Sequence, residues 1–181
     1  MNNLNFSPFP KLETEKLKLR QLINEDENQI FSIRSDKNMA EFLDRPLCKS
    51  LEEARQFIIK INNGIKNNEC IYWAVTLKEN PKLSGTICLW QISVEEAKAE
   101  IGFELLPEYQ GRGIIQEAVK SVLDFGFNKI NLSAIEGEVA PGNIKSIKVM
   151  KRFGFQKVNE IRENDPDESK EGITVMCRLQ L

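Results

Sequence analysis

The chain has 181 residues and a hydrophobic content of 41%, which fits one compact domain with a sizeable core. Its 25 basic and 27 acidic residues give a formal net charge of -2, so no general attraction to nucleic acid or to an anionic membrane is expected. The sequence has no histidine, which excludes a Ser-His-Asp triad and a Cys-His dyad, and it has no apolar run long enough to span a bilayer.

The N-terminal part of the chain predicts a lead-in, one strand and a short helix. Residues 1–11 have no periodic pattern and are expected to be irregular. Leu17 and Leu19 alternate with basic residues, which is typical of a half-buried strand. Asn24 then offers an N-cap, with Glu27 three residues later and apolar residues beyond it, so we expect a short helix there.

A longer helix and three strands are expected in the middle of the chain. Ser50 and Glu53 form a clear capping box, and apolar residues at helical spacing continue to about residue 66. Three apolar runs then predict strands over 70–77, 85–92 and 99–106. The pair Asn80-Pro81 is expected to form the turn between the first two of them.

The C-terminal part of the chain alternates helices and strands. The predicted elements are helix 113–128, strand 132–139, helix 143–154, and a hairpin of strands 156–163 and 172–179 across the polar loop 164–171. This order favours an α+β fold, a single domain over 1–181 with one central mixed sheet of about seven strands and about four flanking helices. The unit from 99 to 139 is expected to be a right-handed crossover between parallel strands.

The four cysteines are widely spaced in apolar or strand-like surroundings: Cys48, Cys70, Cys88 and Cys177. Without a CxxC pair or any histidine they do not fit a structural zinc site, and no metal is expected. We interpret them as reduced core thiols. The start of the chain also lacks the basic and apolar regions of a signal peptide, so these features together predict a cytoplasmic location.

The stretch from Ala99 to Val119 is the most informative part of the sequence. A strand-like run ends at Pro107, the turn Gln110-Gly111-Arg112-Gly113 follows, and a helix begins directly after it. The start of a helix has free backbone N–H groups and a partial positive charge, and glycines let the backbone approach a ligand closely. The pattern therefore indicates a turn that binds phosphate. Taken alone, the two glycines also fit a simple turn before a helix.

These residues resemble the GNAT superfamily of acyl-CoA-dependent N-acetyltransferases, and within it the branch that contains the ribosomal-protein N-terminal acetyltransferases. The family signature Arg/Gln-x-x-Gly-x-Gly/Ala reads Gln110-Gly111-Arg112-Gly113-Ile114-Ile115, with Ile115 in place of the usual small residue. A second block matches downstream, where Asn143-x-x-Ser146 opens a helix and Phe153-Gly154-Phe155 ends it. The resemblance implies the fold of this family and acetyl-CoA as the acetyl donor.

The resemblance also implies which residues hold acetyl-CoA. Backbone N–H groups at the helix start would bind the pyrophosphate, Arg112 would add a charge-assisted bond, and Asn143 would bind the pantetheine arm. Leu105 would offer its N–H to the thioester carbonyl. The residues expected at the cofactor are Leu105, Gln110, Gly111, Arg112, Gly113, Ile115, Gln116, Asn143 and Ser146. The alternatives are a solvated surface position for Arg112 and a simple helix cap for Asn143.

The resemblance places Ser146 beside the thioester sulfur, where its hydroxyl would protonate the departing thiolate. The two tyrosines of the chain, Tyr72 and Tyr109, both lie outside the second block and are not candidates for this role. A serine in the first turn of a helix also fits a purely structural position. A CoA thiol is moreover a tolerable leaving group without a dedicated acid.

Glu100 and Glu104 are the candidate general bases, because they lie on one face of the same predicted strand. The rise of a strand separates them by roughly 13 Å, so one amine cannot use both directly. The resemblance favours Glu100, since the family often carries its base about ten residues before the signature. Each also fits a solvent-facing carboxylate, and Glu163 or Asp165 in the closing hairpin is a further alternative.

Two further groups of residues have mainly structural interpretations. Trp73, Trp90 and Phe103 lie in predicted strands and are interpreted as core, with the acceptor cleft as the alternative. Four basic residues recur at helical spacing and are interpreted as a solvated face, with the 3′-phosphate of CoA as the alternative: Lys145, Lys148, Lys151 and Arg152.

The predicted function is transfer of an acetyl group from acetyl-CoA to a primary amine by direct attack, with a glutamate as the base. A peptide α-amine with a pKa of ~7.7–8.0 is roughly 10–20% neutral at pH 7, whereas a lysine amine at ~10.4 is neutral in about one molecule in 2,500. A modest base therefore favours the N-terminal α-amine of a peptide or protein. Small-molecule amines such as polyamines and aminoglycosides stay open.

Two other classes of function are alternatives to an acetyltransferase. A non-catalytic acyl-CoA-binding regulatory module would use the same fold and the same turn. A P-loop or dinucleotide-binding protein is disfavoured, because the turn lacks both a Gly-Lys-Ser/Thr ending and the GxGxxG spacing. No nucleic-acid or membrane partner is expected, and the sequence does not distinguish a monomer from a homodimer.

Overall fold

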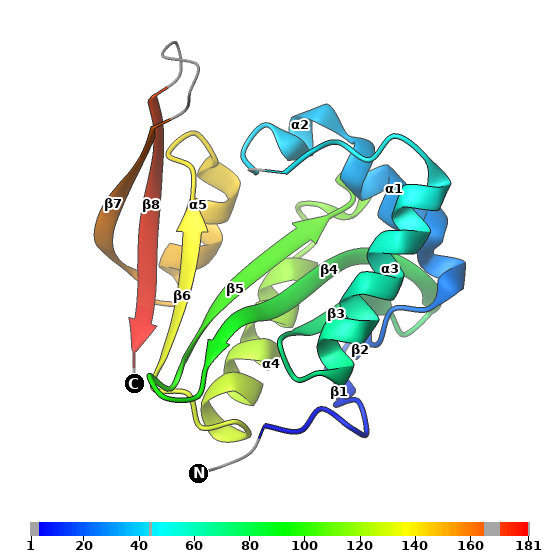
Figure 1. Ribbon diagram of the computed structural model, residues 1–181, viewed down its shortest axis with the longest axis horizontal. Coiled ribbons are helices and arrows are strands. Elements are labelled where there is room, and N and C mark those ends of the chain that lie inside the picture. Colours follow the sequence, from blue (N-terminus) through cyan, green and yellow to red (C-terminus); the bar gives the residue numbers. More distant parts are fainter. Residues whose placement is uncertain (1–3, 44, 165–170, 181) are drawn as a thin grey trace.

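A mixed sheet of eight strands runs through the computed structural model, which describes residues 4–43, 45–164 and 171–180 but not the side chains of 159–177 (Figure 1). The strands are β1 (Leu12–Glu13), β2 (Leu17–Arg20), β3 (Ile71–Leu77), β4 (Asn80–Ser93), β5 (Lys98–Leu105), β6 (Ala134–Val139), β7 (Gln156–Asn164) and β8 (Glu171–Gln180). Their order in the sheet is β1-β2-β3-β4-β5-β6-β8-β7. Only the β5–β6 pair is parallel, as expected for strands joined by a helical crossover.

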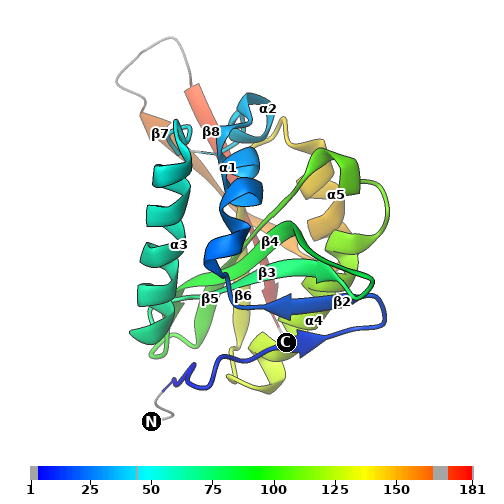
Figure 2. The same cartoon turned by 90° about the vertical axis from the view of Figure 1, so that its right-hand side faces the viewer.

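Helices cover both faces of the sheet (Figures 1 and 2). The α-helices of the described residues are α1 (Glu27–Ser35), α2 (Lys37–Ala40), α3 (Leu51–Lys66), α4 (Ile114–Asn128) and α5 (Ile144–Arg152), and two short 3-10 helices are η1 (Asn24–Asp26) and η2 (Pro107–Tyr109). Helices α1 to α3 lie on one face, which we call the α3 face, and α4 and α5 lie on the other, which we call the α4 face. None of the helices in the described residues is long and apolar enough to cross a membrane.

Each face has its own apolar core. On the α4 face, Trp73 is fully buried, packs edge-on against Phe125 with ring centroids 5.4 Å apart, and donates from its indole N–H to the carbonyl of Pro10. On the α3 face, Ile30 and Ile58 pack against the other side of the same strands. This alternation of buried side chains along β3 explains why the strand reads as a nearly continuous apolar run.

Strands β5 and β6 separate from one another partway along their length, and the predicted site residues lie around this separation. The two strands pair in register only over Lys98–Glu100 and Ala134–Glu136. Beyond these pairs they diverge toward the end where α2 lies, as Figure 1 shows. Among the described strands, the second half of β5 therefore has only β4 as a neighbour, and the backbone groups on its other edge are not paired with a strand.

The structure corrects four details of the sequence-based predictions. The short β1 hairpins onto β2, so the sheet has eight strands rather than about seven, and α2 makes five α-helices rather than about four in the described residues. Asn24 opens η1 and is not the N-cap of the following helix, because Asp26 holds that position. The turn before β4 lies at Lys78-Glu79 and not at Asn80-Pro81, which already belong to the strand.

Candidate active site

The turn after β5 leaves the start of α4 open. Gly111 and Gly113 both have a φ of 77°, a left-handed conformation that residues with a β-carbon rarely adopt. Gly113 is the N-cap of α4, and no side chain of the described residues caps this helix end. The N–H groups of Ile115 and Gln116, in the first helical turn, consequently lack the cap bond that a side chain normally supplies. An uncapped helix start of this kind suits an anion.

Gln110 connects this turn to the two neighbouring elements. Its Nε2 donates to the carbonyl of Leu105 at 3.0 Å, and its Oε1 accepts from Nζ of Lys145 at 2.8 Å. The side chain thereby joins the end of β5 to the first turn of α5. Arg112 extends over the ring of Tyr109, with 5.8 Å from the guanidinium carbon to the ring centroid. The side chain of Gln110, a predicted cofactor residue, is therefore already engaged within the protein.

The opposite wall of the opening is the start of α5. Asn143 is its N-cap, because the Oδ1 atom accepts from the N–H of Ser146 at 3.1 Å. Ser146 is half-buried, and no hydrogen bond of its hydroxyl is found among the described residues. A β-carbon at Gly142 would meet the ring of Phe42 at 3.0 Å, so the segment after α2 reaches the turn that precedes α5. This contact bridges the diverging strands at their open end.

The pairing register directs the free backbone groups of β5 toward that opening. The N–H of Leu106 donates to the carbonyl of Ser84 at 3.0 Å, so these two residues form a hydrogen-bonded antiparallel pair. Because such pairs alternate, the next pair, Gly85 with Leu105, does not exchange hydrogen bonds. The N–H of Leu105 hence points away from β4, into the space that β6 has left. This is the donor that the sequence predicted for the thioester carbonyl.

Glu100 lies on the α3 face at the point where β5 and β6 begin to diverge. It is paired in register with Trp90 on β4 and with Glu136 on β6. Burial raises the pKa of Glu100 to about 7, and the neighbouring carboxylates of Glu138 and Glu136 act in the same direction. A hydrogen bond from the side chain of Trp90 acts against them. A carboxyl that titrates near neutral pH is suited to exchange protons with an amine.

Glu104 has a different environment, although it lies on the same face of β5. Its Oε1 accepts from Nη2 of Arg45 at 2.6 Å, and both side chains are largely buried, with exposed fractions of 14% and 13%. The guanidinium of Arg45 therefore engages the Glu104 carboxylate in a charge-assisted hydrogen bond. The structure thus brings Glu100 to an open position and Glu104 into an ion pair.

Trp90 corrects one sequence-based interpretation. It was interpreted mainly as core, as Trp73 is, but 47% of its surface is exposed. The indole stands beside Glu100 on the α3 face. Phe103 is half-buried and packs against the core of the α4 face. Glu163 and Asp165, the further candidates for the base, lie outside the described side chains and residues.

Three of the four cysteines have described side chains. Cys48, Cys70 and Cys88 are free thiols, and burial raises the pKa of Cys88 far above its usual range, so this thiol stays protonated. The prediction for Cys177 falls outside the described side chains. The basic face of α5 is exposed, with Lys145 engaged by Gln110 as described above.

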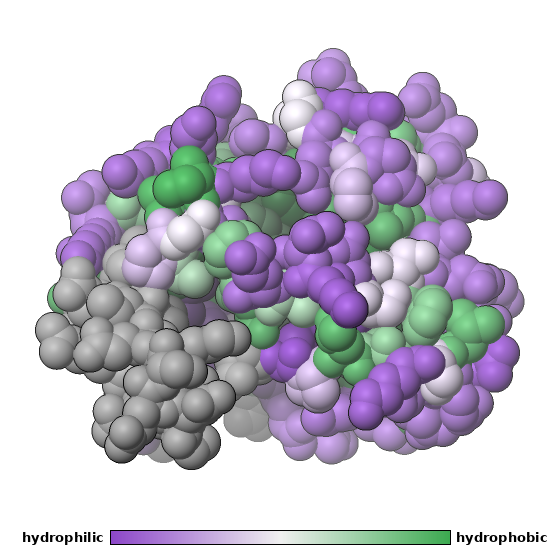
Figure 3. Space-filling view, turned by 90° about the horizontal axis from the view of Figure 1, so that it is seen from above, coloured by the Kyte–Doolittle hydropathy of each residue, from purple (hydrophilic) through white to green (hydrophobic). Residues whose placement is uncertain are grey.

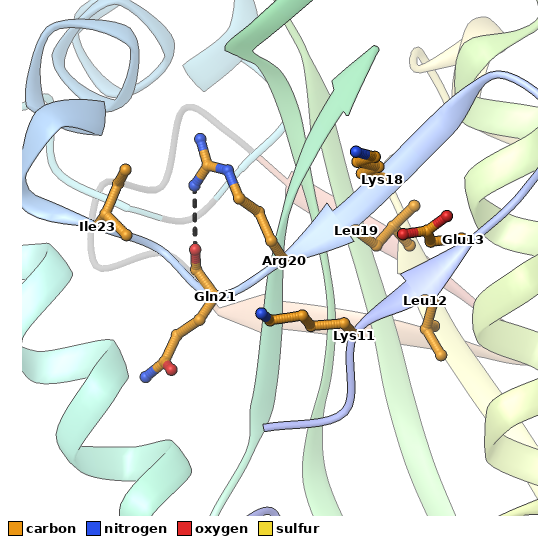
Figure 4. A pocket seen from close by; sticks show the side chains of 8 residues that line it. All are labelled: Lys11, Leu12, Glu13, Lys18, Leu19, Arg20, Gln21 and Ile23. Carbon is orange, nitrogen blue, oxygen red and sulfur yellow. Dashed lines mark hydrogen bonds between the residues drawn. The ribbon is translucent and has the colours of Figure 1, made fainter. Parts of the chain in front are cut away.

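Figure 3 looks down onto the open strand ends, where apolar side chains are visible below a rim of polar ones. A separate hollow lies at the opposite edge of the sheet, beside β1 and β2 (Figure 4). It is lined by Lys11, Leu12, Glu13, Lys18, Leu19, Arg20, Gln21 and Ile23. Its Arg20 is held by Asp26 and by the carbonyl of Gln21, and none of the predicted site residues reaches it. The predicted site residues lie instead around the opening between β5 and β6.

Two residues of the cleft carried no recognisable signal in the sequence. Arg34, near the end of α1, and Arg45, after α2, approach Glu104 only because those segments fold over the end of β5. Nothing in their local sequence marks them as site residues, since they belong to no recognised motif.

Comparisons with known proteins agree with this geometry. Residues 16–156 match the family described as Acetyltransferase (GNAT) domain. An uncharacterized N-acetyltransferase of Bacillus licheniformis is 32% identical to the chain over 152 residues, which cover 84% of this chain and 85% of that protein.

Two solved structures have the same fold. A ribosomal-protein alanine acetyltransferase from Vibrio fischeri superposes with a TM-score of 0.79 at 25% identity, over 94% of this chain and 96% of that one. A spermidine N-acetyltransferase from Vibrio cholerae, solved in complex with CoA and spermine, gives a TM-score of 0.80 at 22% identity, over 92% and 96% of the two chains.

Proposed function

Since the chain belongs to the GNAT family of acetyl-CoA-dependent N-acetyltransferases, we propose that it acetylates the N-terminal α-amine of a peptide or protein, with Glu100 as general base. The observation that carries the proposal is the position of Glu100, a carboxyl with a pKa of about 7 on the acceptor side of the opening between β5 and β6.

The residues present fit acetyl-CoA. The uncapped start of α4 offers N–H groups of Gly113, Ile115 and Gln116 to a pyrophosphate, and Gly111 allows the turn that exposes them. The free N–H of Leu105 and the amide of Asn143 face the opening along which a pantetheine arm would lie. When bound, acetyl-CoA supplies an activated acetyl group. Arg112 beside this turn is the side chain that would pair with a phosphate.

Glu100 would take the proton that the attacking amine must lose. At a pH near its pKa of about 7, a substantial fraction of the carboxyl is ionised and able to accept that proton. An α-amine with a pKa of ~7.7–8.0 is partly neutral at pH 7, so little free energy is needed to deprotonate it. Deprotonating a lysine amine at pH 7 costs roughly 4.6 kcal/mol. The pKa values of the Glu100 carboxyl and of an α-amine are therefore close, which favours an α-amine as the acceptor.

Ser146 and Glu104 have the supporting roles in this proposal. Ser146 lies in the first turn of α5 with a hydroxyl that no described residue engages, so it is free to donate a proton to a departing thiolate. Glu104 is ion-paired with Arg45, which makes it a structural member of the acceptor cleft rather than a second base.

A polyamine is the second candidate acceptor, and the acidic lining favours it. Glu100, Glu136 and Glu138 lie on adjacent strands on the α3 face, and carboxylates attract a multiply charged amine. A relative of this chain, the spermidine acetyltransferase of Escherichia coli, is 32% identical over 78 residues, or 43% of the chain. Glu136, however, is already paired with Arg178, which reduces the negative charge available to a substrate.

The test is the release of CoA from acetyl-CoA across a panel of acceptors. The panel contains short peptides with a free N-terminus, the same peptides with a blocked N-terminus and a free lysine, spermidine, and an aminoglycoside. The proposal expects the highest kcat/KM for the free N-terminus. A higher kcat/KM for spermidine would establish the polyamine alternative, and tight binding of acetyl-CoA without turnover of any acceptor would contradict both.

A further inference from the structure

Arg34 carries a positive charge that the described part of the protein does not neutralise. Its guanidinium lies over the ring of Phe57, 3.9 Å from the centroid, and no hydrogen bond or ion pair joins it to another described residue. Burial, followed by the nearby cation of Arg45, lowers its pKa, which shows that the charged form is not compensated there. Half-buried cations usually have an anionic partner, because leaving water is costly for a charge.

Arg45 beside it is under-satisfied as well. Its two terminal nitrogens bond to Glu104 and to the carbonyls at the end of α1, but its Nε is buried without a partner among the described groups. Two guanidinium groups thus face the single carboxylate of Glu104. The cluster of Arg34, Arg45 and Glu104 therefore keeps a net positive charge, and Nε of Arg45 is an unused hydrogen-bond donor. Arg45 and Glu104 are both partly exposed, so solvent reaches the cluster.

The position of this cluster relates it to the acceptor. Arg34 is close enough to Glu104 for the charge of that carboxylate to influence it, and Glu104 lies on the α3 face of the sheet, as Glu100 does. Along β5, Glu104 is four residues from Glu100, or roughly 13 Å at the rise of a strand. One acceptor can therefore span the two points, with its amine at Glu100 and another group near Arg34.

We propose that Arg34 and Arg45 form a subsite for an anionic group of the acceptor, a carboxylate or a phosphate, so that the preferred acceptor carries its amine and an anion at opposite ends of the cleft. This inference rests on the proposed function, because it takes Glu100 as the place of the amine. An extended peptide covers ~3.3–3.6 Å per residue, so roughly 13 Å corresponds to about four residues of backbone. A long anionic side chain supplies part of this length, which brings its position to the second or third residue. A polyamine lacks the group that this subsite binds.

Matched tripeptide amides test the subsite. Each pair differs only by glutamate against glutamine at the second or third position, and one further peptide has phosphoserine there. With the wild type, the glutamate or phosphoserine peptide should have a kcat/KM about 10- to 100-fold above that of the glutamine peptide, the range expected for a charge-assisted bond. The comparison of glutamate with phosphoserine decides between the two anions.

Substituting Arg34 tests whether the preference for an anionic peptide arises at this subsite. Arg34→Gln should remove the preference while leaving kcat/KM for the glutamine peptide and the KM for acetyl-CoA unchanged, and Arg34→Lys should restore part of it. Arg55→Gln is the matched control, because Arg55 is an exposed arginine on α3 whose partners are Glu27 and Glu52. It should keep the full preference.

Binding of the same peptides to the CoA-saturated protein, measured by calorimetry, requires no turnover. Tighter binding of the anionic peptide in the wild type but not in Arg34→Gln supports the subsite even if the proposed α-amine activity fails. Equal binding of the two peptides, binding of neither, or a preference that persists in Arg34→Gln overturns the inference and leaves the proposed activity standing on its own assay. Faster acetylation of spermidine than of every anionic peptide also overturns it.

Discussion

Trp90 and Glu100 are direct partners across β4 and β5, and the side chain of Trp90 lowers the pKa of the Glu100 carboxyl by acting on it as a hydrogen-bond donor. The pair stands where β5 and β6 begin to diverge, with 47% of the Trp90 surface exposed to the cleft. An indole in this position restrains the rise in pKa that burial imposes on the carboxyl. Glu100 therefore titrates near neutral pH instead of remaining protonated.

Replacing Glu100 should remove the proton acceptor. For the wild type, kcat/KM for a peptide α-amine should rise with pH through about 7, because the pKa of Glu100 is raised to about 7 and only the carboxylate accepts a proton. Glu100→Gln should lower kcat/KM by about 10²–10⁴-fold and lose that part of the pH profile. Exposed Glu95 serves as the control in Glu95→Gln. An unchanged profile in Glu100→Gln would remove this residue as the base.

Replacing Trp90 should shift the same titration. Trp90→Phe keeps an aromatic ring but loses the N–H that stabilises the carboxylate, so the pKa of Glu100 should move upward and the rise in kcat/KM should occur at higher pH. In the double variant with Glu100→Gln, the Trp90 substitution should have no further effect on the profile. A shift toward lower pH would contradict the assignment of the hydrogen bond.

Gly113 should be required for cofactor binding beyond its effect on stability. Alanine at a φ of 77° costs about 1–2 kcal/mol, and strain at this position would also displace the N–H groups at the start of α4. Gly113→Ala should therefore weaken CoA binding, measured by calorimetry, by about tenfold or more. Gly154→Ala is the matched control, with a φ of 82° at the far end of α5. It should lower the Tm similarly while leaving the Kd for CoA unchanged, and equal losses of affinity in both variants would argue against a specific role.

Glu117 should stabilise the fold in a pH-dependent way. Burial of this side chain raises its pKa, but hydrogen bonds from the Thr14 hydroxyl and the Lys16 N–H outweigh that effect, so the net shift is downward. A carboxyl with a lowered folded-state pKa adds stability above its unfolded pKa and loses it as pH falls through the folded value. Glu117→Gln should cost about 1 kcal/mol at pH 7, or about 2–4 °C in Tm.

The stability difference between wild type and Glu117→Gln should shrink as the pH falls below about 4.5, the ordinary carboxyl value. Thermal unfolding at a series of pH values measures it. Glu95→Gln, at an exposed turn position, should be neutral throughout. A difference that is constant with pH would show that Glu117 acts through packing rather than through its charge.

The sequence was most informative where local geometry alone sets the structure. The capping box at Ser50, the alternating pattern of Leu17 and Leu19, and the glycines before α4 each depend on neighbours within a few residues. The two-residue β1 and the four-residue α2 are too short for any periodicity to appear. Trp90 could not be distinguished from Trp73, because alternation shows which face a strand residue occupies but not whether that face is covered.

By itself, the sequence determined the order of the main elements, the open start of α4 and the presence of two carboxylates on one face of β5, since these follow from chain-local spacing. Only the tertiary structure decided which carboxylate is available. Arg45 comes from a segment 59 residues before Glu104 and engages it, while β6 diverges just beyond Glu100 and leaves that carboxyl desolvated but open. The physical reason is that burial and charge pairing are set by residues distant in the chain, and no local pattern encodes them.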